Sequence, residues 1–156
     1  MECSSRCGGH YTKAGRCNVC GEVFIPIKQP VKHLPDIGFK VIPHNEQRYE
    51  TAGDYFEDAD DWQFRVSALD NADYEFMVLI HELIEWHLTQ RRGLSEPEIA
   101  AFDMAHPELD DPGADKRAPY HKEHMFSLKV EKMLCKFMGL DWSAYDDSFE
   151  NLEYNP

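Results

Sequence analysis

The sequence lacks three features that would assign the protein to a class at once. It has no run of about 20 apolar residues, so we expect no membrane-spanning helix. Its first residues, Met1-Glu2-Cys3, lack the charged and apolar regions of a secretory signal, so we expect a cytoplasmic protein without disulfides. Basic residues are also scarce. The 16 Lys and Arg stand against 29 Asp and Glu, and the formal charge of -13 disfavours broad contact with nucleic acid or an anionic membrane.

The sequence does contain enough apolar material for one compact domain. Of the 156 residues, 42% are hydrophobic and 12% are aromatic, which suits a single core with a small appendage. Residues 1–33 hold five basic and two acidic residues, a formal +3, which leaves -16 for the remainder, and four of the five cysteines lie in the first 20 residues. We therefore expect a separate module at 1–33, a main domain at 34–142 and an acidic tail at 143–156.

The N-terminal module has the spacing of a zinc knuckle. Two turns each present two metal-capable side chains three residues apart, and together they supply four ligands: Cys7, His10, Cys17 and Cys20. Cys3 is a rival for His10, and free thiols in a loose tail are the alternative. A Zn²⁺ ion bound here would be needed to fold so small a segment. The positive charge of the module permits contact with nucleic acid, which the acidic main domain disfavours.

The main domain is expected to be α+β, with a small, mostly antiparallel sheet packed on about three helices. Short apolar or alternating runs predict strands at 22–27, 38–42 and 62–69. Capping residues, prolines and glycine stops predict helices from 70 or 71 to about 92, from 96 to 105 and from 119 to 138. The five acids within residues 54–61 predict a solvated hairpin loop, with a loop for calcium or a basic partner as the minority interpretation.

The helix expected at 71–92 carries the pattern that points most clearly to chemistry. His81 and Glu85 are four residues apart, so their side chains lie about one turn from each other on one face and can chelate a metal ion. On a helical wheel they fall with Glu82 on the polar side, so a solvated helix face is an equal alternative. His87 falls in the middle of the apolar side and is expected to be a hydrogen-bonded core histidine.

The helix expected at 119–138 favours a metal site over a solvated face. Its lysines gather on one side of the wheel, and the opposite side, which we expect to face the core, holds Phe126, Val130, Leu134, Phe137 and Met138. His124 and Glu131 lie on or beside that apolar side. A buried carboxylate without a partner is costly, so Glu131 should meet a cation, a metal ion or a histidine.

The economical arrangement brings His81, Glu85 and His124 to one divalent metal ion. Glu131 is then a fourth ligand or a residue that orients a histidine from outside the ligand set. His121 lies at the edge of its helix face and is a poorer candidate for a ligand. Histidine and carboxylate ligands admit zinc, manganese or iron.

His81-Glu82-Leu83-Ile84-Glu85 follows a strand-like run and resembles the His-Glu-x-x-His helix of zincin metallopeptidases, with Glu85 in place of the second histidine. The resemblance implies that His81 and Glu85 hold the metal and that a later helix supplies the third ligand. It also implies that Glu82 is the general base acting on metal-bound water. A carboxylate ligand lowers the net charge at the metal and thus its Lewis acidity.

A second resemblance covers more of the chain. Ile80-His-Glu-Leu-Ile-Glu85, together with Ala118-Pro-Tyr-His-Lys-Glu-His124 and Glu131, is similar to an uncharacterised family of short bacterial and bacteriophage proteins. The similarity runs from about residue 44 to residue 142 and implies that this stretch is one unit. It implies no established activity, and the cysteine module lies outside it.

Other catalytic classes fit the residues less well. Glu82-x-x-Glu85 suggests the helical nucleotide pyrophosphohydrolases, which bind magnesium through paired carboxylates, but their second Glu-x-x-Asp element is not evident after Gly93. The zinc deaminase pattern fails because no Pro-Cys-x-x-Cys follows. Cys135 is expected in the core, and Asp103 is one more carboxylate that could orient a ligand.

Two functions of different class remain. The first is a zincin-like metal-dependent hydrolase that acts on a carbonyl group, most simply that of a peptide. The second is a non-catalytic zinc-binding interaction protein, of phage origin by resemblance. In that case both metals are structural and the acidic surface binds a basic host or phage protein. Neither interpretation involves a membrane.

Overall fold

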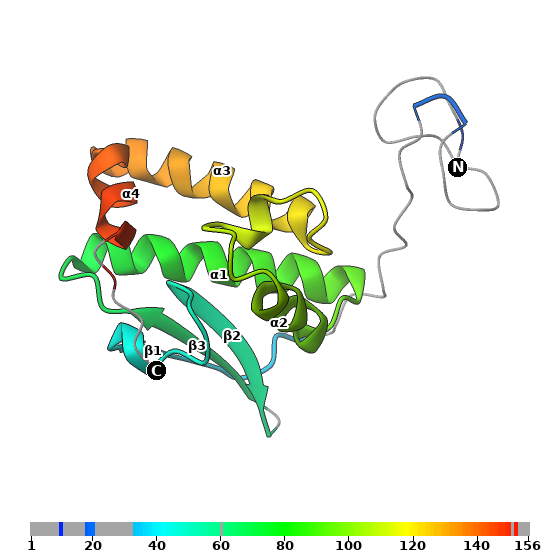
Figure 1. The fold of residues 1–156 in the computed structure, drawn as a ribbon, viewed down its shortest axis with the longest axis horizontal. Helices are drawn as coiled ribbons and strands as arrows, with labels where there is room; N and C mark the ends of the chain where they lie inside the picture. Colours follow the sequence, from blue (N-terminus) through cyan, green and yellow to red (C-terminus); the bar gives the residue numbers. More distant parts are fainter. Residues whose placement is uncertain (1–9, 11–17, 21–32, 60, 151, 153–156) are drawn as a thin grey trace. The chain divides into compact units, whose positions relative to one another are not determined.

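The computed structural model describes residues 10, 18–20, 33–59, 61–150 and 152 of the chain (Figure 1). Residue contacts divide the chain into two units, Met1–Pro30 and Val31–Pro156, and the sheet and the helices all belong to the second unit. The strand predicted at 22–27 and two of the predicted zinc ligands, Cys7 and Cys17, lie outside the described residues.

Three strands form a mixed sheet in the order β1-β3-β2, built from β1 (Ile37–Ile42), β2 (Gly53–Asp58) and β3 (Asp61–Ser67). Tyr55 of β2 pairs with Phe64 of β3 in an antiparallel hairpin, whereas Phe39 of β1 pairs with Phe64 in parallel. The α+β class is confirmed, but the prediction of a mostly antiparallel sheet was wrong. The chain reverses direction twice between β1 and β3, so these two neighbours point the same way.

The acidic segment 54–61, predicted to be a solvated hairpin loop, does contain the turn between β2 and β3, and Glu57, Asp58 and Asp61 are exposed. Its first residues, however, belong to strand β2. Asp54 is buried in β2, and Arg48 donates to both of its carboxylate oxygens, at 2.7 and 2.9 Å. Arg48 also donates to Oε1 of Glu96 at 2.6 Å. The prediction was wrong for Asp54 because it counted acids without the cation that neutralises this one, and an ionised carboxylate can be buried when it is paired in this way.

Two helices follow at the predicted places, α1 (Ala72–Arg92) and α2 (Glu96–Ala105). The side chain of Asn71 caps the start of α1, and Gly93 ends it with φ of 79°, in the left-handed region that favours glycine. Ser95 and Glu98 form the predicted capping box of α2. These local signals fix both helices before any tertiary contact is considered.

The C-terminal part of the chain holds two more helices, α3 (His121–Met138) and α4 (Trp142–Glu150). The helix predicted from residue 119 begins at 121 and ends at Gly139, where φ is 72°. The fourth helix occupies most of the segment expected to be an acidic tail. Tyr145 of α4 is buried, and its ring lies 5.2 Å from that of Tyr74 and 4.9 Å from that of Phe149.

The helix α1 lies between the sheet and α3, and α4 packs against α3 (Figure 1). Two groups of buried residues form the core. One, around Tyr55, Phe64 and Trp86, lies between the sheet and α1, and the other, around Met77, Cys135 and Tyr145, lies toward α4. None of the described helices combines the length and the apolar character needed to cross a membrane.

Part of the contact between α1 and α3 is made by buried polar side chains, which reverses two expectations. His81 and Glu85 are buried, so the solvated-face alternative for this side of α1 was wrong. The predicted core side of α3 was also wrong in part, because Phe126 is 52% exposed and Phe137 is 89% exposed. The buried residues of α3 are instead Glu123, Ser127, Glu131 and Cys135. Buried polar groups need partners, so the polar faces of the two helices lie against each other.

Candidate metal centre

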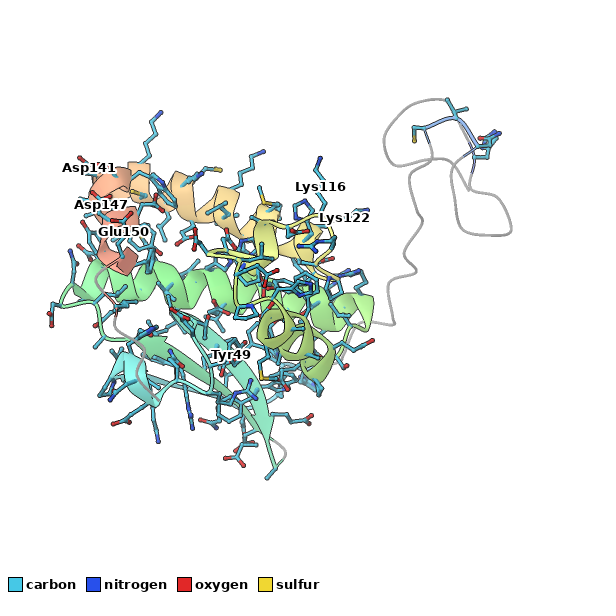
Figure 2. The ribbon with its side chains drawn as sticks, in the orientation of Figure 1. Tyr49, Lys116, Lys122, Asp141, Asp147 and Glu150 are labelled. Carbon is cyan, nitrogen blue, oxygen red and sulfur yellow. The ribbon has the colours of Figure 1, made fainter. Side chains whose placement is uncertain are left out.

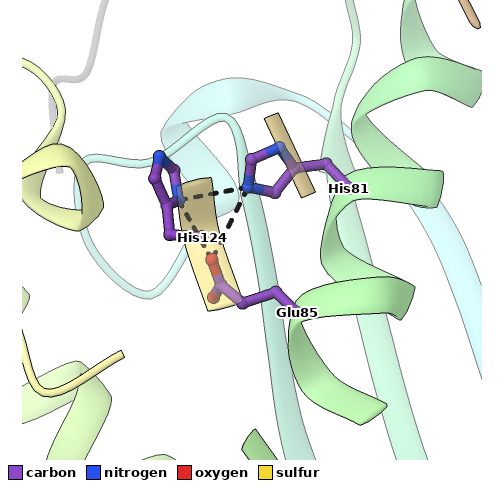
Figure 3. A group of neighbouring side chains, drawn as sticks. All are labelled: His81, Glu85 and His124. Carbon is purple, nitrogen blue, oxygen red and sulfur yellow. Dashed lines mark hydrogen bonds and ion pairs between the residues drawn. The ribbon is translucent and has the colours of Figure 1, made fainter. Parts of the chain in front are cut away.

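Three side chains converge between α1 and α3 (Figure 3). His81 and Glu85 come from successive turns of α1, and His124 comes from the first turn of α3. Nδ1 of His124 lies 3.1 Å from Nε2 of His81 and 3.0 Å from Oε2 of Glu85, and 3.5 Å separates the last two atoms. The group could therefore hold a metal ion, as the sequence predicts.

The spacing of the three atoms suits a small divalent ion. Zinc bonds to imidazole nitrogen and carboxylate oxygen are about 2.0–2.2 Å long, which places tetrahedral ligands about 3.3–3.6 Å apart. The observed separations of 3.0, 3.1 and 3.5 Å are close to that range. Three protein ligands would leave a fourth tetrahedral position for water or a substrate. Two imidazoles and one carboxylate are also a donor set found at catalytic zinc.

Carboxylates on the far sides of the two rings decide which nitrogens face the centre. Nδ1 of His81 donates to Oε2 of Glu131 at 2.8 Å, and Nε2 of His124 donates to Oδ1 of Asp111 at 3.1 Å. Each neutral ring therefore turns its unprotonated nitrogen inward, as in the carboxylate–histidine–zinc arrangement. Two lone pairs and a carboxylate oxygen about 3 Å apart repel one another unless imidazole protons or a metal ion lie among them.

Glu131 contacts the outer nitrogen of His81 and does not face the centre of the triangle formed by His81, Glu85 and His124. Its Oε2 contacts Nδ1 of His81, whereas Nε2 of the same ring faces the other two ligands. The hydroxyl of Tyr145 donates to Oε1 of Glu131, so α4 holds the carboxylate in place. Of the two roles predicted for Glu131, this hydrogen bond favours the orienting one.

His124 is held by a segment for which the sequence predicts only a polar loop. The segment contains a short 3-10 helix, η2 (Pro112–Ala114), and the side chain of Asp111 caps it as well as contacting His124. A Cβ atom on Gly113 would lie 2.3 Å from Cγ of His124. Only glycine allows this segment to approach the ring so closely.

The second oxygen of Glu85 also has a partner. Oε1 accepts a hydrogen bond from the hydroxyl of Tyr55 on β2 at 3.3 Å, and that hydroxyl lies 3.5 Å from Oγ1 of Thr89. Each member of the triangle thus presents one atom to the centre and is held through another atom by a second residue. Such outer partners limit the motion of ligands and raise the affinity for an ion.

Glu82, the predicted general base, follows His81 on α1, and its carboxyl group packs against β2. A Cβ atom on Gly53 would lie 2.5 Å from Oε1 of Glu82, so the glycine leaves the space that this carboxyl group occupies. Burial, together with the charge of Glu85, raises the pKa of Glu82 to about 8. A bound dication nearby would lower that pKa and leave Glu82 as a carboxylate.

The centre attracts positive charge even without a metal ion. Burial opposes the protonation of His81, but the hydrogen bonds to Glu131 and Glu85 outweigh it and raise the pKa of His81 to about 11. Burial likewise opposes the charge on His124, and the hydrogen bonds to Asp111 and Glu85 raise its pKa to about 9. The same carboxylates that hold these protons would stabilise a divalent ion in their place.

These shifts predict a pH-dependent stability for the metal-free protein. Both histidines have folded-state pKa values above the unfolded value of about 6.5. Their contribution is therefore complete below about pH 6.5 and is lost as the pH rises through 9 toward 11. The pKa of Glu82 is also raised in the folded state, so its contribution to stability likewise falls as the pH rises above about 4.5. We expect the midpoint of thermal unfolding of chelator-treated protein to fall between pH 6.5 and pH 9.5.

The matched variant for this experiment is Glu131→Gln, which removes the carboxylate that raises the pKa of His81. In this variant the unfolding midpoint should fall less steeply with pH. Added zinc should make the unfolding midpoint of the wild-type protein less dependent on pH, because the ion replaces the lost protons. A midpoint that rises over this pH interval would contradict the assignment.

Three other predicted residues lie outside the triangle. Nδ1 of His121 donates to the carbonyl oxygen of Gly113 at 2.9 Å. His87 is half-buried beside Trp86. Asp103 accepts a hydrogen bond from the hydroxyl of Tyr120 at 2.5 Å, and burial raises the pKa of Asp103 to about 6. None of the three contacts His81, Glu85 or His124 through a hydrogen bond that the described residues record.

Three residues that hold the ligands were not identified from the sequence: Tyr55, Asp111 and Tyr145. Asp111 carried a usable signal, because an aspartate directly before Pro112-Gly113 is typical of a capped turn that presents a carboxylate. The two tyrosines carried none, since each contacts the site only through the packing of another element.

The zinc knuckle stays a prediction. Of its four proposed ligands, His10 and Cys20 are described, and both are exposed. The backbone N–H of Asn18 donates to the carbonyl oxygen of His10 at 3.1 Å, so His10 and Asn18 are neighbours.

No family model, curated protein or solved structure matches the chain. The resemblance to zincins therefore rests on the residues around His81, Glu85 and His124 alone.

Proposed function

We propose that the unit at residues 31–156 is a metal-dependent hydrolase. His81, Glu85 and His124 bind one divalent ion, and Glu82 accepts a proton from the water bound to that ion. The observation that carries the proposal is the triangle of donor atoms, 3.0 to 3.5 Å apart, in which each side chain is held from outside by another residue.

The chemistry follows from what each group can do. A divalent ion lowers the pKa of bound water toward 7 and polarises a carbonyl oxygen. Glu85 contributes a negative charge to the ligand set, which makes the ion a weaker Lewis acid than three neutral histidines would. Deprotonation of the water therefore depends more strongly on Glu82. Peptide carbonyls are the proposed substrate class because the His81-Glu82-x-x-Glu85 helix resembles that of the zincins.

Restoration of activity by metal ions tests the proposal. Full-length protein is stripped with a chelator and assayed on a mixture of quenched fluorogenic peptides, before and after zinc, manganese or ferrous iron is added. We expect no hydrolysis without metal and hydrolysis with at least one of the three ions. Anomalous scattering from crystals grown with that ion should show it between His81, Glu85 and His124. A bound ion at that position without any peptide hydrolysis would overturn the proposal.

The burial of the ligands favours a second candidate, a structural metal site in an interaction protein. The side chains of His81, Glu85 and His124 are only 10%, 6% and 13% exposed. In that case the ion ties α1 to α3, and the change Glu82→Gln affects neither metal content nor partner binding. The two candidates therefore differ in the role of Glu82: the hydrolase needs it for turnover, whereas the interaction protein does not need it for metal or partner binding.

A further inference from the structure

The outer face of α3 carries apolar side chains that nothing in the described fold covers. Phe126, Met133 and Phe137 are 52%, 63% and 89% exposed, and Val130 lies between them along the helix. These four residues are spaced by four, three and four positions, which is the spacing of the contact seam of a coiled coil. The face thus has the pattern that packs against another helix, although α3 already packs against α1 through another side, which holds its buried residues.

Lysines run along one flank of this seam. Lys122, Lys129 and Lys136 are seven residues apart, so they occupy the same flanking position in three successive heptads. None of the three forms an ion pair with any acid in the described part of the chain, although the whole protein carries 29 acidic residues. Lys122 lies at the outer edge of the body near the start of α3 (Figure 2).

A shallow hollow lies beside the seam on the same face of α3. Its volume is about 300 Å³, and its lining is formed by Met125, Leu128, Lys129, Lys132, Met133 and Lys136. Methionine side chains adapt to the shape of a partner, and the lysine stems cover apolar surface while their ammonium groups stay in water. The hollow is therefore suited to an apolar side chain from a partner whose acidic groups meet the lysines.

We propose that the outer face of α3 is a docking site for an amphipathic helix of another protein that carries Glu or Asp beside its apolar seam. The charge pattern decides between occupants. In an antiparallel pair of two copies the lysine flanks would face each other, and in a parallel pair the lysines would face Ser127 and Leu134, which carry no charge. Neither arrangement supplies the carboxylates that the flank requires.

An anionic membrane surface fits the observations less well. The lysines would suit its phosphates, but the formal charge of -13 on the whole chain opposes approach to such a surface. An acidic helix covers only the α3 face and leaves the other acids of the protein in water.

Binding of designed peptides to the full-length protein tests the proposal. The probe is a fluorescein-labelled helical peptide of about three heptads with Leu in the seam and Glu on both flanks. Two control peptides have the same composition in scrambled order and Lys in place of Glu. We expect fluorescence anisotropy to show binding of the Glu peptide only. The paired change Phe126→Ser and Phe137→Ser should weaken it on the order of tenfold or more.

Charge reversal supplies the sharper readout. The paired change Lys129→Glu and Lys136→Glu should transfer binding from the Glu peptide to the Lys peptide. The control for the Phe126 and Phe137 variant changes two other exposed apolar residues, Phe39→Ser on β1 and Met104→Ser on α2, and should leave the affinity unchanged. Circular dichroism checks that each variant keeps its helices.

Three outcomes would overturn the proposal. The first is equal binding of the Glu and scrambled peptides, or no binding of either. The second is a wild-type dimer in sedimentation experiments that Phe126→Ser and Phe137→Ser dissociate, because the occupant is then a second copy. The third is co-sedimentation with phosphatidylcholine vesicles containing phosphatidylserine that depends on the lysines, because the occupant is then a lipid surface.

Discussion

Changing Glu82 to Gln is expected to lower peptide turnover by on the order of 10²- to 10⁴-fold while the metal content stays the same. Glutamine has nearly the same shape as glutamate but cannot accept a proton from bound water. Glu82 also lies outside the triangle of His81, Glu85 and His124, so its loss removes no ligand. The measurement is kcat on the peptide that the metal-restored wild-type protein cleaves, with metal content determined on the same samples.

The matched control is Glu108→Gln, a change of the same kind at an exposed position on a loop. It should leave kcat within about twofold of wild type, since exposed substitutions away from a site have small effects. Unchanged turnover in Glu82→Gln would remove the general base from the mechanism. Loss of metal in that variant would instead place Glu82 among the ligands.

Removal of His124 should cost more metal affinity than removal of the residue that holds it. Loss of an outer partner typically weakens binding by about 10- to 100-fold, which is the expectation for Asp111→Asn. We expect His124→Ala to weaken zinc binding by more than that, because it deletes one of three donor atoms. His87→Ala, a histidine of α1 outside the triangle, is the control and should bind as the wild type does.

Competition with a chromophoric chelator measures these affinities. All proteins should carry Cys17→Ser and Cys20→Ser, so that the predicted zinc knuckle does not contribute to the titration. Wild-type affinity in His124→Ala would rule out the triangle as a metal site. Equal losses in His124→Ala and Asp111→Asn would mean that Asp111 is itself a ligand.

The local part of the structure could be predicted from the sequence, whereas its tertiary part could not. Asn71, Gly93 and Ser95 act within one turn of the helix ends that they cap, so the limits of α1 and α2 follow from the sequence. The pairing of β1 with β3 depends on contacts across the intervening hairpin, and no local pattern records it.

The three candidate ligands could be predicted because two independent constraints coincide. His81 and Glu85 share a helix face by spacing, and the carboxylate of Glu131 demanded a buried partner, which proved to be His81. The orientation of α3 was mistaken because its apolar residues were assumed to face inward. Two buried carboxylates of α3 find their cationic or histidine partners on α1, since Glu123 pairs with Arg92 and Glu131 with His81, and that requirement outweighs the exposure of Phe137.

The protonated histidines have one more consequence, which concerns the stoichiometry of binding. Near neutral pH the metal-free centre holds two imidazole protons, on His81 and His124, and both must leave when a divalent ion binds. Glu82, whose pKa of about 8 a bound ion would lower, also loses a proton below about pH 8, so the net charge of the centre falls by one unit when the ion binds. Binding is therefore steeply sensitive to acidity. The apparent affinity would change by up to about 100-fold per pH unit between about pH 8 and pH 9, and more steeply below about pH 8.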